Sequence, residues 1–236
     1  MAGIVALYAY DATVLLYADE LVAWPRRRGW SAHAGGELQW RGGFLFVPAL
    51  YWPSAPLLRL RWLQATRPPA APRAEARVAI LQQALRPLQW AVWLMAALLF
   101  LVLPLVLLAW RRDDLLLVLL AAIYLLAGAM VTYLVRARQR LGLPPRAVAA
   151  LAIDTLACPP FALNLVRKIG LRQALDLDAL AFTSRMLPSP GFQRLRPRLL
   201  VRLDALLLAE PEDNERSAQL KAARARLLEE EPHGNA

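Results

Sequence analysis

The sequence predicts an α+β membrane protein: a small N-terminal mainly-β domain, an antiparallel two-helix transmembrane hairpin and an α-helical C-terminal region. Three observations lead to this fold class. Two apolar runs without a charged residue, 88–110 and 115–135, follow one another closely. Short stretches rich in Val, Leu and aromatic residues, separated by Gly pairs, precede these runs. Stretches rich in Leu, Ala and Arg follow them.

Residues 1–65 are expected to form a small, mainly-β cytoplasmic domain. It contains two stretches rich in Val, Leu and Tyr, Gly3–Tyr10 and Thr13–Trp24. It also contains two Gly pairs that mark turns, Gly35-Gly36 and Gly42-Gly43. The clearest strand is Leu57–Leu63. Its Leu58, Leu60 and Trp62 alternate with Arg59 and Arg61, which is the period of a half-buried strand.

Residues 66–87 connect this domain to the hairpin. Thr66–Arg73 (TRPPAAPR) has the composition of a stiff Pro-rich linker. Glu75–Leu85 has apolar residues at helical spacing and predicts an amphipathic helix. A break or kink is expected near Pro87, because proline has no N–H to donate within a helix.

The hairpin itself occupies residues 88–135. Its first run, 88–110, is 23 residues long, and at 1.5 Å per residue it would span roughly 34 Å, enough for a ~30 Å hydrocarbon core. The second run, 115–135, has 21 residues. Tryptophans stand near both ends of the first run, where indole rings prefer the headgroup boundary. Pro104 lies inside this run and predicts a kink.

Only four residues, Arg111–Asp114, separate the two runs, so the helices must be antiparallel neighbours. The two arginines would follow the C-terminus of the first helix and the two aspartates would open the second, which suits both helix dipoles. Gly128 and Thr132 are four residues apart and share one face of the second helix. Small residues at this spacing favour close packing of a helix.

Charge and composition place the chain at a membrane. Its hydrophobic fraction is 58% and its net charge is +10. The charge lies in the flanks, since residues 1–87 and 136–236 each carry an excess of five basic side chains. The tight turn between the spans contains two arginines, whereas four precede the first span and four follow the second. These are Arg67, Arg73, Arg77 and Arg86, and Arg136, Arg138, Arg140 and Arg146. The positive-inside rule therefore predicts cytoplasmic N- and C-termini.

The compartment follows from further features. The N-terminus lacks the basic start of a signal peptide, and with a single cysteine, Cys158, no intrachain disulfide is possible, so nothing argues for an oxidising compartment. Only Lys168 and Lys221 are lysines, an arginine preference typical of a GC-rich bacterial genome. We therefore expect a multi-pass protein of the bacterial inner membrane.

Residues 136–236 are expected to form a helical cytoplasmic or interfacial region. Its apolar segment 147–166 contains Asp154 and is interrupted by Pro159-Pro160. It is either a third span or two short helices that lie in or dip into the interface, and the interruption favours the second reading. Further helices are expected at three stretches, the first two separated by a Pro-rich loop over 188–197: 171–187, 199–209 and 217–231.

Candidate chemistry is sparse. Asp154 is a carboxylate in an apolar run and is a weak candidate for catalysis. Basic residues near the spans could bind lipid headgroups or phosphate: Arg136, Arg138, Arg140, Arg167, Lys168 and Arg172. His33 and His233 are the only histidines, so we expect no metal site and no cofactor. Cys158 is expected to be a small buried residue, with a nucleophile or a palmitoylation site as alternatives.

These features predict a non-enzymatic membrane-anchored scaffold or accessory subunit that docks a partner. One alternative is a membrane-interface enzyme acting on lipid-linked or anionic substrates with Asp154 and nearby cations. Another is a subunit of an oligomeric channel or transporter. The expected partners are a bilayer with anionic headgroups and a protein partner or a second copy. Nucleic acid is not expected, because no basic run is interleaved with aromatic residues.

Overall fold

The computed structural model describes residues 2–26, 29–36, 38–61, 71–110, 112–173, 179–209 and 214–229. The chain forms two compact units. The helical unit comprises Met1–Thr13, Val47–Leu57 and Ala76–Gln173, and the sheet unit comprises Val14–Phe46, Leu58–Glu75 and Ala174–Ala236. The molecule is α+β, with the sheets in the N-terminal part of the sequence and helices after them.

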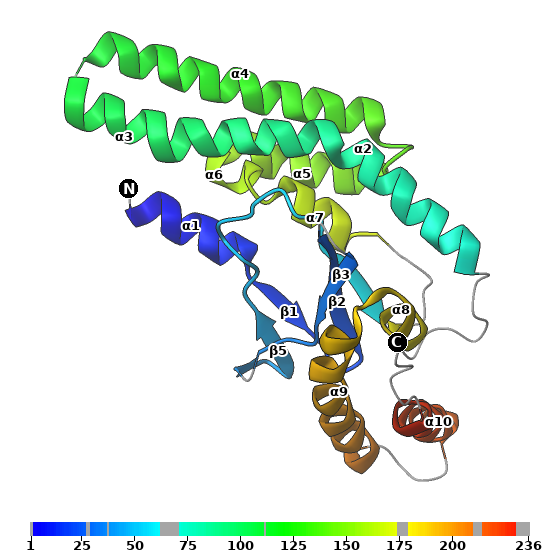
Figure 1. Ribbon diagram of the computed structural model, residues 1–236. Coiled ribbons are helices and arrows are strands. Elements are labelled where there is room, and N and C mark those ends of the chain that lie inside the picture. Colours follow the sequence, from blue (N-terminus) through cyan, green and yellow to red (C-terminus); the bar gives the residue numbers. More distant parts are fainter. Residues whose placement is uncertain are drawn as a thin grey trace. The chain divides into compact units, whose positions relative to one another are not determined.

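The helical unit contains the two longest helical stretches, which lie side by side (Figure 1). The first continues from α2 through two π-helical turns and a short α-helical one, and α4 returns beside it: α2 (Ala71–Ala97), η1 (Leu98–Val102), α3 (Leu103–Leu105), η2 (Val106–Trp110) and α4 (Asp113–Ala137). The Tyr133 hydroxyl of α4 donates to the Ala84 carbonyl of α2 at 2.7 Å. The antiparallel hairpin that the sequence predicts is therefore present.

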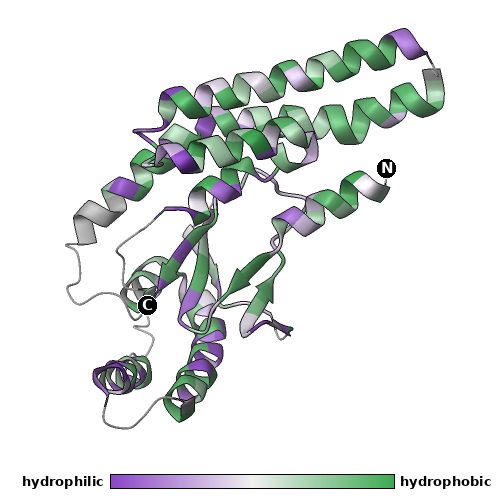
Figure 2. Cartoon of the chain, turned by 180° about the vertical axis from the view of Figure 1, so that it is seen from behind, coloured by the Kyte–Doolittle hydropathy of each residue, from purple (hydrophilic) through white to green (hydrophobic). Residues whose placement is uncertain are grey.

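Both arms of the hairpin are long and apolar enough to cross a membrane, over Ala76–Ala109 and Asp113–Ala137. Figure 2 shows both as hydrophobic along most of their length. The buried side of α4 follows a spacing of three and four residues: Leu119, Ile123, Ala127, Met130, Leu134 and Ala137. Large apolar residues such as Leu108 (72% exposed) and Leu125 (75% exposed) cover the other sides of the hairpin.

Two prolines lie inside the first arm, and neither ends it. The break that we expected near Pro87 does not occur, since α2 runs through this residue. Pro87 is exposed, while Leu85 and Leu88 pack inside, so packing outweighs one lost backbone bond. Around Pro104 the helix also continues, with π-helical turns on both sides. Turns of this kind re-satisfy backbone groups freed by a proline.

The N-terminal segment corrects one sequence prediction. Residues 3–10, which we placed in the β domain, belong to a helix, α1 (Ala2–Ala12). The segment contains several alanines, and Tyr8 and Ala12 share one face because they are four residues apart. Both are buried, and the Thr13 hydroxyl donates to the Ala9 carbonyl at 2.9 Å. Packing of this face outweighs the β-propensity of Val and Tyr.

The apolar segment after the hairpin is broken, as predicted. It forms α5 (Pro145–Ala157), α6 (Pro159–Ala162) and α7 (Leu165–Leu171), with the interruption at Cys158. Gly170 of α7 lies against the backbone of Leu57, where any Cβ would collide with the Leu57 carbonyl. A glycine is therefore required for α7 to pack against segment 47–57.

The sheet unit contains two antiparallel three-stranded sheets (Figure 1). The first has the order β1-β5-β4 and the second β3-β2-β6, with these bounds: β1 (Val14–Leu16), β2 (Glu20–Arg26), β3 (Gly29–His33), β4 (Gln39–Trp40), β5 (Gly43–Phe46) and β6 (Leu58–Arg61). The predicted turn at Gly42-Gly43 is present, with Arg41 and Gly42 at positive φ between the paired Trp40 and Gly43.

Strand β6 confirms the predicted alternation. Leu58 and Leu60 are buried in the core, and Arg59 and Arg61 reach Glu20 on the paired strand β2. Glu20 is fully buried, and it accepts hydrogen bonds from Arg61 Nε at 2.8 Å and from its own turn at Tyr17 N. Trp62 and Leu63, which complete the predicted strand, lie outside the described residues.

The C-terminal part is helical: α8 (Ala179–Met186), α9 (Ser189–Ala209) and α10 (Glu215–Glu229). The loop expected over 188–197 is instead the first half of α9. Pro190 falls in the first helical turn, where a missing N–H costs nothing, and the apolar face with Phe192, Leu195 and Leu199 is buried. A single helix over 171–187 is also wrong, because α7 ends at Leu171. The last predicted helix corresponds to α10.

Candidate functional site

The polar cluster of the helical unit lies where α1 packs against α6 and α7. Asn164, between α6 and α7, is fully buried and joins the three elements. Its amide nitrogen donates to the Tyr8 carbonyl at 3.1 Å and to Asp11 Oδ2 at 3.0 Å. Its amide oxygen accepts from Arg167 at 2.9 Å. Asn164 therefore fixes the C-terminal half of α1 against the break in the apolar segment.

Arg167 is the most enclosed charge of this cluster, at 2% exposure. One guanidinium nitrogen donates to the carbonyls of Ala49 at 2.7 Å and Trp52 at 2.9 Å. The other donates to the Tyr8 hydroxyl at 3.2 Å and to Asn164. Burial lowers the pKa of Arg167 below its usual value, but four neutral acceptors compensate the charge. Arg167 thus holds segment 47–57, α1 and α7 together.

Lys168 binds two carboxylates from different helices. Its ammonium lies 2.7 Å from Asp11 Oδ1 of α1 and 3.1 Å from Asp154 Oδ2 of α5. The same ammonium lies 5.0 Å from the centre of the Phe161 ring. Asp11 is mostly buried, whereas the Asp154 side chain is 42% exposed. An ion pair therefore accounts for the position of Asp154 in an apolar helix, and its catalytic role stays a prediction.

Sequence reasoning missed Tyr8 and Asp11 as members of this cluster. On the strand expected over 3–10, residues 8 and 11 would point to opposite faces. On a helix they are three apart and share a face. The available signal was the single acidic residue at the end of an apolar, alanine-rich run.

The remaining predicted site residues lie elsewhere in the helical unit. Arg136, Arg138 and Arg140 are exposed at the C-terminal end of α4 and in the turn after it. Arg172 is exposed and donates to the Ala147 carbonyl at 2.9 Å. The structure therefore separates the predicted phosphate binders into two groups: these exposed arginines, and the internally bonded pair Arg167 and Lys168. Binding of phosphate by either group stays a prediction.

No described residue packs on the predicted packing face of α4 at Gly128. The Thr132 hydroxyl donates to the Gly128 carbonyl at 2.8 Å. A Cβ added at Gly128 would meet no atom of the described residues within 4 Å. Any helix that packs on this face must therefore come from another molecule or from outside the described part of the chain.

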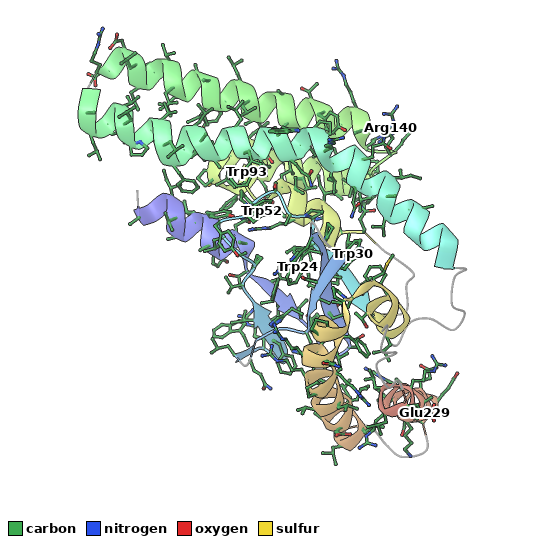
Figure 3. The ribbon with its side chains drawn as sticks, viewed as in Figure 1. Trp24, Trp30, Trp52, Trp93, Arg140 and Glu229 are labelled. Atoms are coloured by element: carbon green, nitrogen blue, oxygen red, sulfur yellow. The ribbon has the colours of Figure 1, made fainter. Side chains whose placement is uncertain are left out.

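Aromatic side chains gather on the helical unit around the start of the hairpin. Trp52 and Trp93 meet edge to face, with ring centroids 5.7 Å apart (Figure 3). Gln89 donates to the Ser54 carbonyl at 3.2 Å, and the Tyr8 and Phe100 rings lie 6.1 Å apart. Segment 47–57 and α1 thus lie along the first arm. The exposed aromatic residues of these three elements are Tyr10, Tyr51, Trp52, Trp90 and Trp93.

The described residues of both units contain few metal-ligating or nucleophilic side chains. Among the described residues, no group of three or more His, Cys, Asp or Glu could hold a metal ion. Cys158 is half-buried and free, and His233 lies outside the described residues. The comparisons found no similarity: no family model, no curated protein and no solved structure matches the chain.

Proposed function

We propose that the chain is a non-enzymatic anchor and docking protein of a membrane, with the hairpin inserted in the bilayer. One observation carries this proposal: only 22% of the most apolar window of each arm is buried inside the protein. The core helix of a soluble protein would be mostly buried. Fully exposing a Leu side chain to water costs about 1.5–3 kcal/mol, and the hairpin exposes many of them. Lipid chains are the solvent that removes this cost.

The proposed orientation has both termini in the cytoplasm of a bacterial cell, and the tip of the hairpin on the other side. Asp113 and Asp114 lie in the first turn of α4, at its positive end, and Arg112 pairs with Asp114 at 2.8 Å. The exposed arginines at the other end of α4 would contact anionic headgroups. The aromatic residues around Trp52 and Trp93 would lie at the same interface.

The polar cluster supports a structural rather than a catalytic role for Asp154. Its carboxylate is already paired with Lys168, and Lys168 is shared with Asp11. The cluster ties α1 and segment 47–57 to the helices beside the hairpin. A rigid, membrane-anchored surface of this kind suits docking of a protein partner or of a second copy. An enzyme using Asp154 and a channel subunit remain the two alternatives.

Topology is tested by cysteine labelling in intact spheroplasts, in a Cys158→Ser background. Exposed positions in the two parts are Gln39 and Gln219 for the sheet unit and Asp113 for the hairpin tip. We expect an impermeant maleimide to label Asp113→Cys only. Labelling of Gln39→Cys or Gln219→Cys, or release of the protein from membranes by alkaline carbonate, would contradict the proposal.

Docking is tested by cross-linking in native membranes followed by mass measurement of the purified species. A stoichiometric partner or a homo-oligomer is expected, unchanged in Asp154→Asn. A chain that remains monomeric and unpartnered contradicts the docking role. An Asp154→Asn variant that keeps normal abundance and assembly but loses its cellular phenotype would favour the enzyme.

A further inference from the structure

A second group of basic side chains lies within the sheet unit, on α9 and around the end of β3. Arg198 and Arg202 are four residues apart on α9 and share one face. Arg198 Nη1 lies 3.1 Å from His33 Nε2. The Arg202 guanidinium lies 3.7 Å from the centre of the Phe44 ring, and its Nη2 lies 3.0 Å from where a Cβ on Gly35 would be. Gly35 in turn donates its N–H to His33.

Arg202 is a buried charge with one unsatisfied terminal nitrogen. The residue is 6% exposed, and its Nη1 has no hydrogen-bond partner among the described residues. The aromatic ring of Phe44 offers a cation–π contact but accepts no strong hydrogen bond. Burial and the charge of Arg198 lower the pKa of Arg202 to about 10, so it remains cationic at neutral pH. Buried guanidinium groups are normally paired or fully hydrogen-bonded.

The hydrogen bonds of His33 show a second missing acceptor. The Gly35 N–H donates to His33 Nδ1 at 2.9 Å, so Nδ1 carries no proton. Burial lowers the pKa of His33 below 6.5, and the charges of Arg198 and Arg202 lower it further. The neutral ring must then carry its proton on Nε2. This N–H faces Arg198 Nη1 at 3.1 Å, which places two donors against each other.

We propose that His33, Arg198 and Arg202 form a binding site for a phosphate-type oxyanion. The three donor groups come from two neighbouring elements, β3 and α9, and two of them are cationic. Arg198 contacts His33, and the charges of both arginines act on the His33 ring. No acidic side chain pairs with Arg198 or Arg202 in the part of the chain that the structure describes. A tetrahedral oxyanion has enough acceptor oxygens for all three, and guanidinium groups bind such oxygens in pairs. The ligand would relieve both the unpaired Nη1 and the donor–donor contact.

The probe is inorganic phosphate, titrated into the detergent-purified full chain by calorimetry against chloride at equal ionic strength. We expect one saturable site, with affinity reduced about tenfold in Arg198→Gln, the loss of one charge-assisted contact. Arg194→Gln is the matched control, since Arg194 is exposed on the same helix and carries the same charge. It should bind phosphate as the unaltered protein does. Equal weakening by both variants would mean diffuse charge attraction and would overturn the site.

Imidazole nitrogen NMR gives an independent readout. In a His233→Gln background His33 is the only histidine, and its spectrum should show the Nε2–H form and shift on addition of phosphate. An Nδ1–H form, or a spectrum that phosphate does not change, would contradict the proposal. Glu37 stands two residues from Gly35 in the sequence and lies outside the described residues. The Glu37→Gln variant is a control for an acceptor supplied by the chain itself, and phosphate binding that appears only in this variant would overturn the proposal.

The phosphate group could be free or part of a lipid headgroup. Nanodiscs of phosphatidylcholine with and without phosphatidic acid separate these sources. A His33 shift that needs phosphatidic acid and disappears in Arg198→Gln assigns the site to a headgroup. Saturation by free phosphate assigns it to a soluble ligand. Failure of both probes overturns the oxyanion site and leaves the membrane-anchor proposal untouched.

Discussion

Arg167 in the helical unit and Arg202 in the sheet unit are both buried arginines without a carboxylate partner among the described residues, yet their surroundings differ. The two terminal nitrogens of Arg167 donate to four protein acceptors. Among the described residues, the Arg202 guanidinium faces the Phe44 ring and its Nη1 has no acceptor, whereas in Arg167 only Nε lacks one. A buried charge whose terminal nitrogens the protein itself satisfies is part of the fold. A buried charge with an unsatisfied terminal nitrogen calls for a ligand.

The largest effect is expected from Arg167→Met. The variant leaves the carbonyls of Ala49 and Trp52 and the amide of Asn164 without their donor. We expect a loss of about 3–5 kcal/mol, a large fraction of the stability of a typical domain. Arg167→Lys should rescue little, because one ammonium cannot reach acceptors in two directions. Thermal unfolding in detergent measures the loss. A variant that melts within a few degrees of the unaltered protein would contradict the role of Arg167 in holding segment 47–57, α1 and α7 together.

A smaller effect separates the two carboxylates that share Lys168. Asp11 is mostly buried and also accepts from Asn164, whereas Asp154 is substantially exposed. We expect Asp11→Asn to lower the free energy of unfolding by about 1–2 kcal/mol and Asp154→Asn by less than about 1 kcal/mol. Chemical denaturation of the two variants side by side gives the ranking. The reverse order would show that Asp154 has a role that its ion pair does not explain.

The sequence and the structure agree where one strong physical term decides. Two charge-free runs separated only by Arg111–Asp114 predicted the hairpin, and the alternation of Leu and Arg predicted the buried face of β6. The predictions for residues 3–10 and for the start of α9 were wrong. They followed the β-propensity of the first segment and the prolines of the second, whereas burial of Tyr8 and Phe192 decides that both segments are helical. The surroundings of neither buried arginine could be predicted from the sequence, since Arg167 donates to a hydroxyl 159 residues away and the ring beside Arg202 belongs to β5.

Arg202→Leu should change stability far less than the change at Arg167. The variant loses a cation–π contact of about 2 kcal/mol and removes the cost of an unpaired buried charge, and these terms offset each other. We expect the phosphate-free protein to unfold within about 1 kcal/mol of the unaltered chain, and phosphate to stop raising its melting temperature. Thermal scans with and without phosphate test both statements. A loss of stability as large as that of Arg167→Met would show that Arg202, like Arg167, is a structural residue, and would contradict this prediction.

The smallest effect is a pH dependence of the sheet unit. His33 faces the positive charges of Arg198 and Arg202 and packs on the Phe46 ring at 5.2 Å, and its pKa lies below the unfolded value of 6.5. The unfolded chain therefore binds the proton first, so stability is full above pH 6.5 and declines as the pH falls toward the folded pKa.

His33→Gln should remove this slope. A bound oxyanion should also flatten it, because its negative charge raises the pKa of His33 toward the unfolded value. Stability curves of both variants, with and without phosphate, test this sign. A slope that phosphate leaves unchanged would place the anion away from His33.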